Sequence, residues 1–220
     1  MGYDVGSFPG ARPVVEGEAA RALFARVMGL VAVTCGFAAL GAYAGRDLHG
    51  VAWFIPWLGA IACLIGLNVA ARRAPALAVA LLFAVGFLLG LSVGATVSYY
   101  ATNEPSVVWQ AGAATGLTVA GMGAFGYATR RDLSYLYRYL FWALLALIVV
   151  GLVVILFRID GAQTLYALAG IAIFSGYTLV DFNRLRRAGQ DEVVPLAAGI
   201  FLDVFNLFLL FLQLFGAGRN

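Results

Sequence analysis

The chain has 220 residues, of which 63% are apolar or aromatic and 11% are charged. This balance excludes a water-soluble globular domain, in which about a quarter of the residues are charged. The net charge of +3 arises from arginines without any lysine, which also excludes a retinal Schiff base and P-loop phosphate chemistry, because both need a lysine.

Seven apolar stretches follow one another along the chain and predict seven membrane-spanning helices. A helix rises ~1.5 Å per residue, so ~20 residues cross a hydrocarbon core about 30 Å thick. We therefore predict an all-α integral membrane protein with a polar N-terminal tail (1–21), a transmembrane domain (22–216) and a short C-terminal tail (217–220). The predicted spans are Leu23–Ala44, Val51–Ala71, Pro75–Tyr100, Val107–Ala128, Tyr139–Phe157, Thr164–Val180 and Pro195–Phe215.

Arginines gather on one side of the predicted bundle, and this asymmetry orients it, because cytoplasmic loops retain positive charge. We predict a cytoplasmic N-terminus and an external C-terminus. These arginines lie between apolar spans and are interpreted as topology signals, so nucleic acid is not an expected partner. The cytoplasmic set is Arg12, Arg21, Arg26, Arg72, Arg73, Arg130, Arg131, Arg138, Arg184, Arg186 and Arg187, and the opposite set is Arg46, Arg158 and Arg219.

Glycines recur at four-residue spacing in the third and fourth predicted spans. They are Gly86, Gly90 and Gly94 in the third span and Gly112 and Gly116 in the fourth. This spacing lets helix backbones approach closely in lipid, so we interpret these glycines as packing positions within the monomer.

Two aspartates lie within the predicted spans or at their end, and not in the loops. Asp203 is eight residues into the last span, too deep for a short side chain to reach the interface. Asp181 ends the sixth span, and a short cytoplasmic loop joins these two spans. We predict that the two carboxylates meet in the cytoplasmic half of the membrane.

Asp203, Asn206 and Gln213 share one face of the last span. A polar stripe on an apolar helix avoids lipid, so we expect this helix inside the bundle, with the stripe toward a cavity or pathway. For Asn206 and Gln213, an internal hydrogen-bond network that holds helices together is the favoured alternative.

Two neighbouring carboxylates in a low-dielectric site share a proton and titrate as a unit, which makes a pH sensor possible. Arg72 and Arg73 end the second span on the same predicted side as Asp181. One of them is a candidate latch that pairs with the ionised aspartates and releases them in acid. The alternative is that both arginines are topology signals at the headgroups.

Three stretches, in this order, resemble the Bax inhibitor family of transmembrane proteins in its bacterial branch: GYATRRDLS (126–134), IFSGYTLVDFNRL (173–185) and IFLDVFNLFLLFLQLFG (200–216). The resemblance implies a bacterial inner-membrane protein whose last helix is surrounded by the other six. It also implies a pH-sensitive calcium leak with no resident cofactor, in which Asp181 and Asp203 form the sensor and an arginine of the second helix is the latch. Gln213 stands where the family often has arginine.

The same residues allow weak calcium coordination but not storage. A tight Ca²⁺ site needs six to eight oxygens, and this chain offers two neighbouring carboxylates in the membrane. Asp181 and Asp203, completed by water and backbone carbonyls, suit transient passage. The expected partners are therefore lipid, protons and calcium ions.

Two other functions compete with the leak. An intramembrane aspartyl protease would also use two aspartates on neighbouring helices, but Val180 precedes Asp181, and Asp203 lacks the Gly-x-Gly before it that such proteases have. We therefore do not expect an enzyme. A membrane adaptor that modulates a quality-control protease would instead work through its tail or loops.

Overall fold

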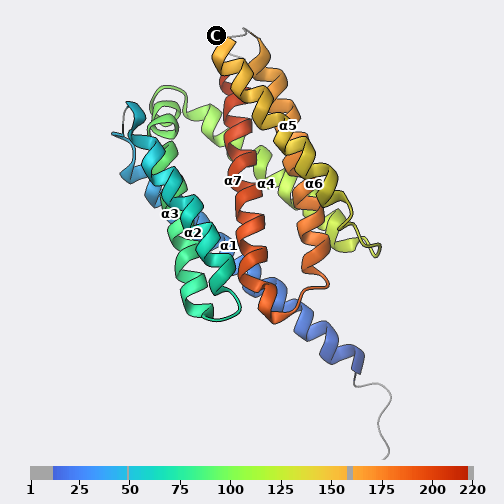
Figure 1. Cartoon of the computed structure of the whole chain (residues 1–220). Helices are drawn as coiled ribbons and strands as arrows, with labels where there is room; N and C mark the ends of the chain where they lie inside the picture. The colour runs from blue at the N-terminus through green and yellow to red at the C-terminus, as the bar shows by residue number, and fades with distance from the viewer. Residues whose placement is uncertain (1–11, 49, 158–160, 218–220) are drawn as a thin grey trace, which may run out of the picture.

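The computed structural model describes residues 12–48, 50–157 and 161–217 (Figure 1). Seven long helices make up most of this described chain, which contains no β-strand, so the predicted all-α class is confirmed. Two short 3-10 turns, η1 (Gly50–Trp53) and η2 (Gln190–Glu192), precede the second and last of them. The helices are α1 (Arg12–Ala44), α2 (Phe54–Ala70), α3 (Pro75–Asn103), α4 (Pro105–Ala128), α5 (Leu136–Phe157), α6 (Ala162–Leu185) and α7 (Val193–Ala217).

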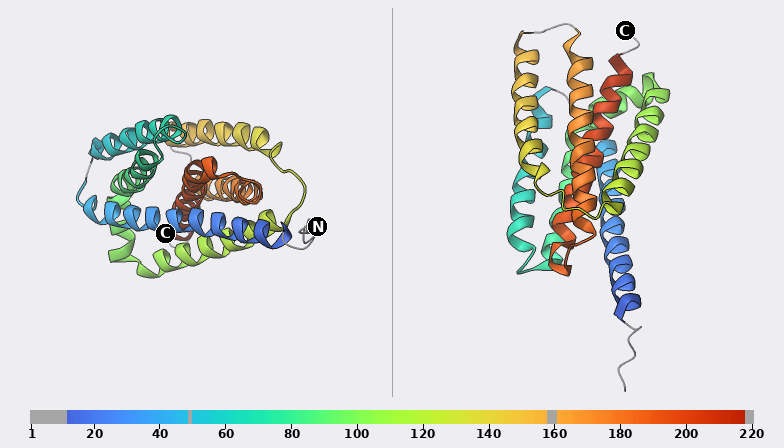
Figure 2. Two further views of the ribbon diagram at one scale, coloured as in Figure 1. Left: turned by 90° about the horizontal axis from the view of Figure 1, so that it is seen from below. Right: turned by 90° about the vertical axis from the view of Figure 1, so that its right-hand side faces the viewer.

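The helices alternate in direction along the bundle, as Figure 2 shows. The start of α1 and the end of α7 lie at opposite ends of the bundle (Figures 1 and 2). The arginine-bearing connections α2–α3, α4–α5 and α6–α7 lie at the end where α1 begins. Arg158 and Arg219 lie outside the described residues. The cytoplasmic side remains a prediction from the arginines.

Six of the seven helices are long and apolar enough to cross a membrane. The helix below that level, α4, has 24 residues but is rich in glycine, alanine and threonine. Large apolar side chains cover the outside, for example Ile65 on α2, Leu117 on α4 and Trp142 on α5, each more than 60% exposed. An exposed apolar surface on this scale suits lipid and not water. The chain is therefore an integral membrane protein.

Helix α1 is longer than its apolar stretch predicts. It begins at Arg12, eleven residues before the predicted start at Leu23. Pro13 lies in the first turn, where its missing N–H costs nothing, and the residues that follow include the good helix formers Glu and Ala. The predicted polar tail is thus helical from residue 12, whereas residues 1–11 lie outside the described part of the chain.

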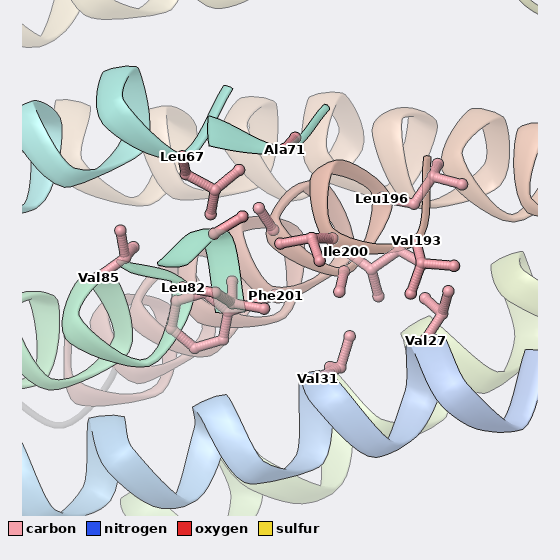
Figure 3. Packing of buried hydrophobic residues seen from close by; sticks show 14 of the residues in the cluster. Val27, Val31, Leu67, Ala71, Leu82, Val85, Val193, Leu196, Ile200 and Phe201 are labelled. Atoms are coloured by element: carbon pink, nitrogen blue, oxygen red, sulfur yellow. The ribbon is translucent and has the colours of Figure 1, made fainter. Parts of the chain in front are cut away.

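The last helix is the most buried of the seven. Over half of the apolar stretch of α7 is buried, against a third or less in the other five apolar spans, and α4 has five buried residues among its 24. It contacts α1, α2, α3, α4 and α6, whereas α5 packs mainly on α6. Its position inside all six remains a prediction. Figure 3 shows the core that it shares with three of these helices. Its labelled residues are Val27 and Val31 of α1, Leu67 of α2, Ala71 directly after α2, Leu82 and Val85 of α3, and Val193, Leu196, Ile200 and Phe201 of α7.

Close backbone packing joins α1 to α3 and confirms one set of glycine predictions. A Cβ added to Gly86 would meet the carbonyl oxygen of Thr34 at 2.6 Å, and Gly90 and Gly94 lie equally close to the α1 backbone. Only glycine permits this approach, so the four-residue spacing in α3 is a packing motif.

The corresponding prediction for α4 is wrong. A Cβ added to Gly112 or Gly116 would meet nothing within 4 Å. Both glycines instead line an open apolar cavity. Spacing alone does not distinguish a packed glycine from one that keeps a surface hollow.

Candidate functional site

Asp181 and Asp203 are both buried, with 6% and 5% of their surface exposed. They lie on α6 and α7, which pack against each other, and they interact electrostatically. The carboxylate of Asp181 lies against Gly199, where a Cβ would collide with its Oδ2. Gly199 is one helical turn before Asp203, so both carboxylates lie along one face of α7. The structure thus brings the two predicted residues together.

One carboxylate oxygen of the pair is free. Oδ2 of Asp203 is buried and has no hydrogen-bond partner among the described residues. A buried polar atom without a partner is unfavourable unless a proton, water or cation satisfies it. Oδ2 of Asp203 is therefore available to bind a proton, a water molecule or a cation.

Two further polar residues, which were not predicted as part of the site, surround Asp181. The phenol of Tyr137 on α5 donates a hydrogen bond to Oδ1 of Asp181. Arg184 interacts electrostatically with both of these residues and forms a 2.9 Å ion pair with Glu192. Helices α5 and α6 therefore each place a group beside Asp181, and the η2 turn holds Arg184 through Glu192.

The pair faces a cavity of about 780 Å³ between α5, α6 and α7. Along α7 its lining extends from Pro195 to Gln213, which is about 27 Å at ~1.5 Å per residue, close to the bilayer thickness. The predicted polar stripe of Asp203, Asn206 and Gln213 lines this cavity. The cavity therefore runs along α7 over most of the thickness of the bilayer.

The amide of Asn206 does not hold two helices together. Its Nδ2 donates to the carbonyl oxygen of Leu202, one turn earlier in the same helix, at 2.7 Å. Asn206 and Gln213 thus present polar side chains to the cavity.

Arg72 and Arg73 are not part of this site. Both are exposed in the turn between α2 and α3. None of the ion pairs among the described residues includes either of them. The cation beside the pair is Arg184, which is three residues from Asp181 on α6. Their i,i+3 spacing in the sequence is typical of an ion pair on one helix, but an arginine at the end of a span is equally typical of a topology signal.

Calcium ligands are few in the described part of the chain. It contains no cluster of three or more His, Cys, Asp or Glu residues that could hold a metal ion. The cavity offers two carboxylates and the amide side chains of Asn206 and Gln213. This donor set suits weak coordination of a hard cation with water completing the shell.

A buried asparagine two residues after Asp181 fixes the α4–α5 connection. Asn183 is 1% exposed, and its Nδ2 donates to the carbonyl oxygens of Gly126, Thr129 and Arg131 at 2.9–3.1 Å. Its Oδ1 accepts the N–H of Leu133 at 3.1 Å. The GYATRRDLS and DFNRL motifs therefore form one unit.

Asp132 closes the turn before α5. Its Oδ1 accepts the backbone N–H of Ser134 at 2.8 Å and pairs with Arg187 at 2.9 Å. These bonds, with Ser134 the larger influence, hold the pKa of Asp132 well below its ordinary value. Asp132 thus stabilises an Asx turn and not the first turn of α5, which begins at Leu136.

Comparison with known proteins agrees with this arrangement. A family model described as inhibitor of apoptosis-promoting Bax1 matches residues 20–220, which include all seven helices from the third turn of α1 onward. The chain belongs to the Bax inhibitor family. The resemblance seen in the three motifs is thereby confirmed.

Three bacterial relatives are similar to this chain, and two of them are named as membrane proteins. An uncharacterized protein of Pseudomonas aeruginosa, PA2604, is 26% identical over 211 residues, 92% of each chain. An uncharacterized membrane protein of Vibrio cholerae is 28% identical over 60% of each chain. The inner membrane protein YbhL of Escherichia coli is 31% identical over 49% of this chain and 52% of its own length. The chain thus spans less than two thirds of the last two relatives.

Proposed function

We propose that this protein is a pH-sensitive calcium leak of a bacterial inner membrane, with Asp181 and Asp203 as the proton sensor and ion-binding pair and with no enzymatic activity. One observation carries the proposal: a buried carboxylate pair with a free oxygen lies in a cavity that follows α7 for most of the bilayer thickness. The arginine distribution supports a cytoplasmic N-terminus and an external C-terminus.

Weak calcium binding follows from the donors in the cavity. A conducting site must bind an ion well enough to admit it and loosely enough to release it. Two carboxylates with amide, carbonyl and water oxygens meet this condition, whereas a storage site uses several carboxylates and a complete oxygen shell. Asn206 and Gln213 line the same cavity between the pair and the C-terminal end of α7. The apolar residues Leu209 and Leu210 lie between them.

The pH response arises from the proximity of the two carboxylates. Because like charges in a low-dielectric site repel, protonation of one aspartate depends on the state of the other. The groups that face the pair are Tyr137 from α5, the side chains of Tyr177, Thr178 and Arg184 from α6, and Glu192 from η2 through Arg184. A proton gained or lost at the pair therefore changes its attraction to Arg184 and to any calcium ion.

An α2 latch is a proposed second element of gating. Arg72 and Arg73 are exposed in the structure, so pairing with the aspartates requires the α2–α3 turn to move. Arg184 already supplies a cation at the pair. If an α2 latch operates, Arg72→Gln or Arg73→Gln alters the pH response; if Arg184 alone balances the pair, only Arg184→Gln does.

The test is calcium flux into liposomes loaded with a calcium dye, measured from acidic to neutral pH. The unmodified protein is expected to pass Ca²⁺ in a pH-dependent way, and Asp181→Asn and Asp203→Asn are each expected to flatten that dependence. Asp191→Asn, which changes an exposed aspartate in η2 at the same end of the bundle, is the matched control and is expected to keep the pH profile. A profile that both cavity variants leave unchanged contradicts the proposal.

The same variants separate the competing functions. A membrane adaptor would lose activity when residues 1–20 are deleted and would tolerate Asp203→Asn. An intramembrane protease would cleave a reconstituted transmembrane substrate, and either aspartate variant would abolish cleavage. The leak predicts the reverse of the adaptor: flux that survives deletion of the tail and loses its pH dependence in Asp203→Asn.

A further inference from the structure

A second cavity, of about 920 Å³, lies between α1 and α4 and has α7 as its floor. Its walls are small or apolar: Phe24 and Met28 on α1, and Gly116 and Ala120 on α4. Helices α1 and α4 are not among the helix pairs that pack closely, which leaves the groove between them. None of its lining residues belongs to the carboxylate cavity.

Helix α7 separates the two cavities. Residues advance about 100° around a helix at 3.6 per turn, so Phe201, Phe205 and Phe208 lie on one face and Asp203 and Asn206 on the opposite one. The aromatic face lines the α1–α4 groove, and the polar face lines the carboxylate cavity. One helix thus presents different chemistry to each side.

The groove cannot hold an ion in its interior. Its interior polar groups are the hydroxyl of Thr115, which already donates to the carbonyl oxygen of Ala111 at 2.8 Å, and the thiol of Cys35. A thiol is only a weak donor, so the groove suits a hydrocarbon ligand. In a bilayer the hydrocarbon available is a lipid acyl chain.

The groove has a cation at one end only. Arg21 lines it at the arginine-rich end of the bundle, is exposed and belongs to none of the ion pairs among the described residues. Tyr127 of α4 lines the same end and packs edge-on against Phe24, with ring centroids 5.4 Å apart. An exposed arginine and a phenol above an apolar channel match a phosphate above an acyl chain.

The length of the groove fits this ligand. Its α1 lining extends from Arg21 to Ala42, which is about 32 Å at ~1.5 Å per residue, enough for a chain that starts at one membrane surface. We propose that the groove binds an anionic phospholipid from the leaflet at the arginine-rich end, with its phosphate at Arg21 and one acyl chain between α1 and α4.

The glycines of α4 supply matched variants. Gly116 lines the groove, and Gly121 does not, yet a Cβ at either position would meet nothing within 4 Å. Leucine at residue 116 would fill the groove, whereas leucine at 121 would extend away from it. Both substitutions remove a helical glycine, so they change helix propensity alike.

The test uses the full chain purified in mild detergent. It is mixed with equal amounts of phosphatidylglycerol and phosphatidylcholine that carry identical acyl chains, and native mass spectrometry counts the bound lipids. The unmodified protein and Gly121→Leu are expected to retain one phosphatidylglycerol, and Gly116→Leu is expected to lose it. Circular dichroism checks that both variants are folded, and Ala124→Leu, also in the groove, replaces Gly116→Leu if that variant unfolds. Retention of the lipid by a folded groove variant overturns the proposal.

The headgroup is tested separately. Arg21→Gln is expected to reduce the preference for phosphatidylglycerol over phosphatidylcholine to near unity while lipid is still bound. Arg138→Gln removes the same charge from an exposed position on α5 and is expected to keep the preference. If Arg138→Gln lowers the preference as much as Arg21→Gln does, the attraction belongs to the whole basic surface and the assignment of the phosphate to Arg21 is wrong.

Discussion

Tyr137 and Asp181 form a hydrogen bond that joins α5 to α6, with the phenol as donor and Oδ1 as acceptor. The bond lies beside Arg184 and at the edge of the cavity that holds Asp203. Tyr137 lies on α5, which packs mainly on α6, and its phenol gives one oxygen of the buried Asp181 carboxylate a partner. Tyr137 therefore positions Asp181 within the pair.

Tyr137→Phe is expected to destabilise the protein by about 1–3 kcal/mol, the usual cost of removing a partner from a buried charged group. The measurement is the free energy of unfolding in detergent. Tyr135→Phe removes a phenol that is 63% exposed and is expected to change stability by less than about 0.5 kcal/mol.

A double-mutant cycle isolates this bond from general packing effects. If the phenol acts through Asp181, Tyr137→Phe costs close to nothing in an Asp181→Ala background, because the acceptor is already gone. An equal cost in both backgrounds would show that Tyr137 stabilises the protein through its ring contacts instead.

Gly199→Ala is expected to destabilise the protein although alanine favours helices by about 1 kcal/mol over glycine. The new methyl group would displace the Asp181 carboxylate from the face of α7. Gly36→Ala on α1, where a Cβ meets nothing within 4 Å, is expected to stabilise the protein. In an Asp181→Ala background the sign for Gly199→Ala should reverse, and unfolding measurements on the four variants test this.

The fold was predictable because the membrane imposes one rule on every span. Apolar stretches of about 20 residues predict helices, and all seven were found, with α4 recognised in the sequence although its composition is the least apolar. The start of α1 was missed because residues 12–22 favour a helix by propensity and not by hydropathy. The two glycine patterns were indistinguishable because spacing does not reveal which surface faces each helix.

The site was predictable where a charge had no alternative location. Asp203 is deep in a span, so its burial followed from depth alone. Arg184, Tyr137 and Asn183 were missed because each is acceptable at a membrane surface or helix end. Their roles depend on how the α4–α5 and α6–α7 connections pack against the bundle. The hydropathy pattern of the sequence predicts the helices but not the path of these connections.

Asn183→Leu is expected to be among the most destabilising single substitutions, by on the order of 3 kcal/mol or more, because each buried backbone group left without a partner costs about 1–3 kcal/mol. The carbonyl oxygens of Gly126 and Arg131 and the N–H of Leu133 would lose this partner, and the carbonyl oxygen of Thr129 would keep only its 3.3 Å bond from Arg186. Asn68→Leu is the control, since the Asn68 amide bonds only Leu64 of its own helix and is exposed. Comparable unfolding free energies for the two variants would contradict the proposed role of Asn183.

Asp132 links stability to pH from outside the membrane. The hydroxyl and the backbone N–H of Ser134, followed by the Arg187 guanidinium, lower the pKa of Asp132 in the folded protein below its ordinary value of 3.8. A lowered pKa means that the ionised carboxylate stabilises the fold fully above about pH 4, and that this contribution is lost as the pH falls through the folded value. Asp132→Asn is therefore expected to lower stability modestly at pH 7, with a loss that shrinks below pH 4. Unfolding at pH 7, 5 and 3 measures this loss, and a loss that is constant with pH would mean that the carboxylate charge of Asp132 does not stabilise the α4–α5 turn.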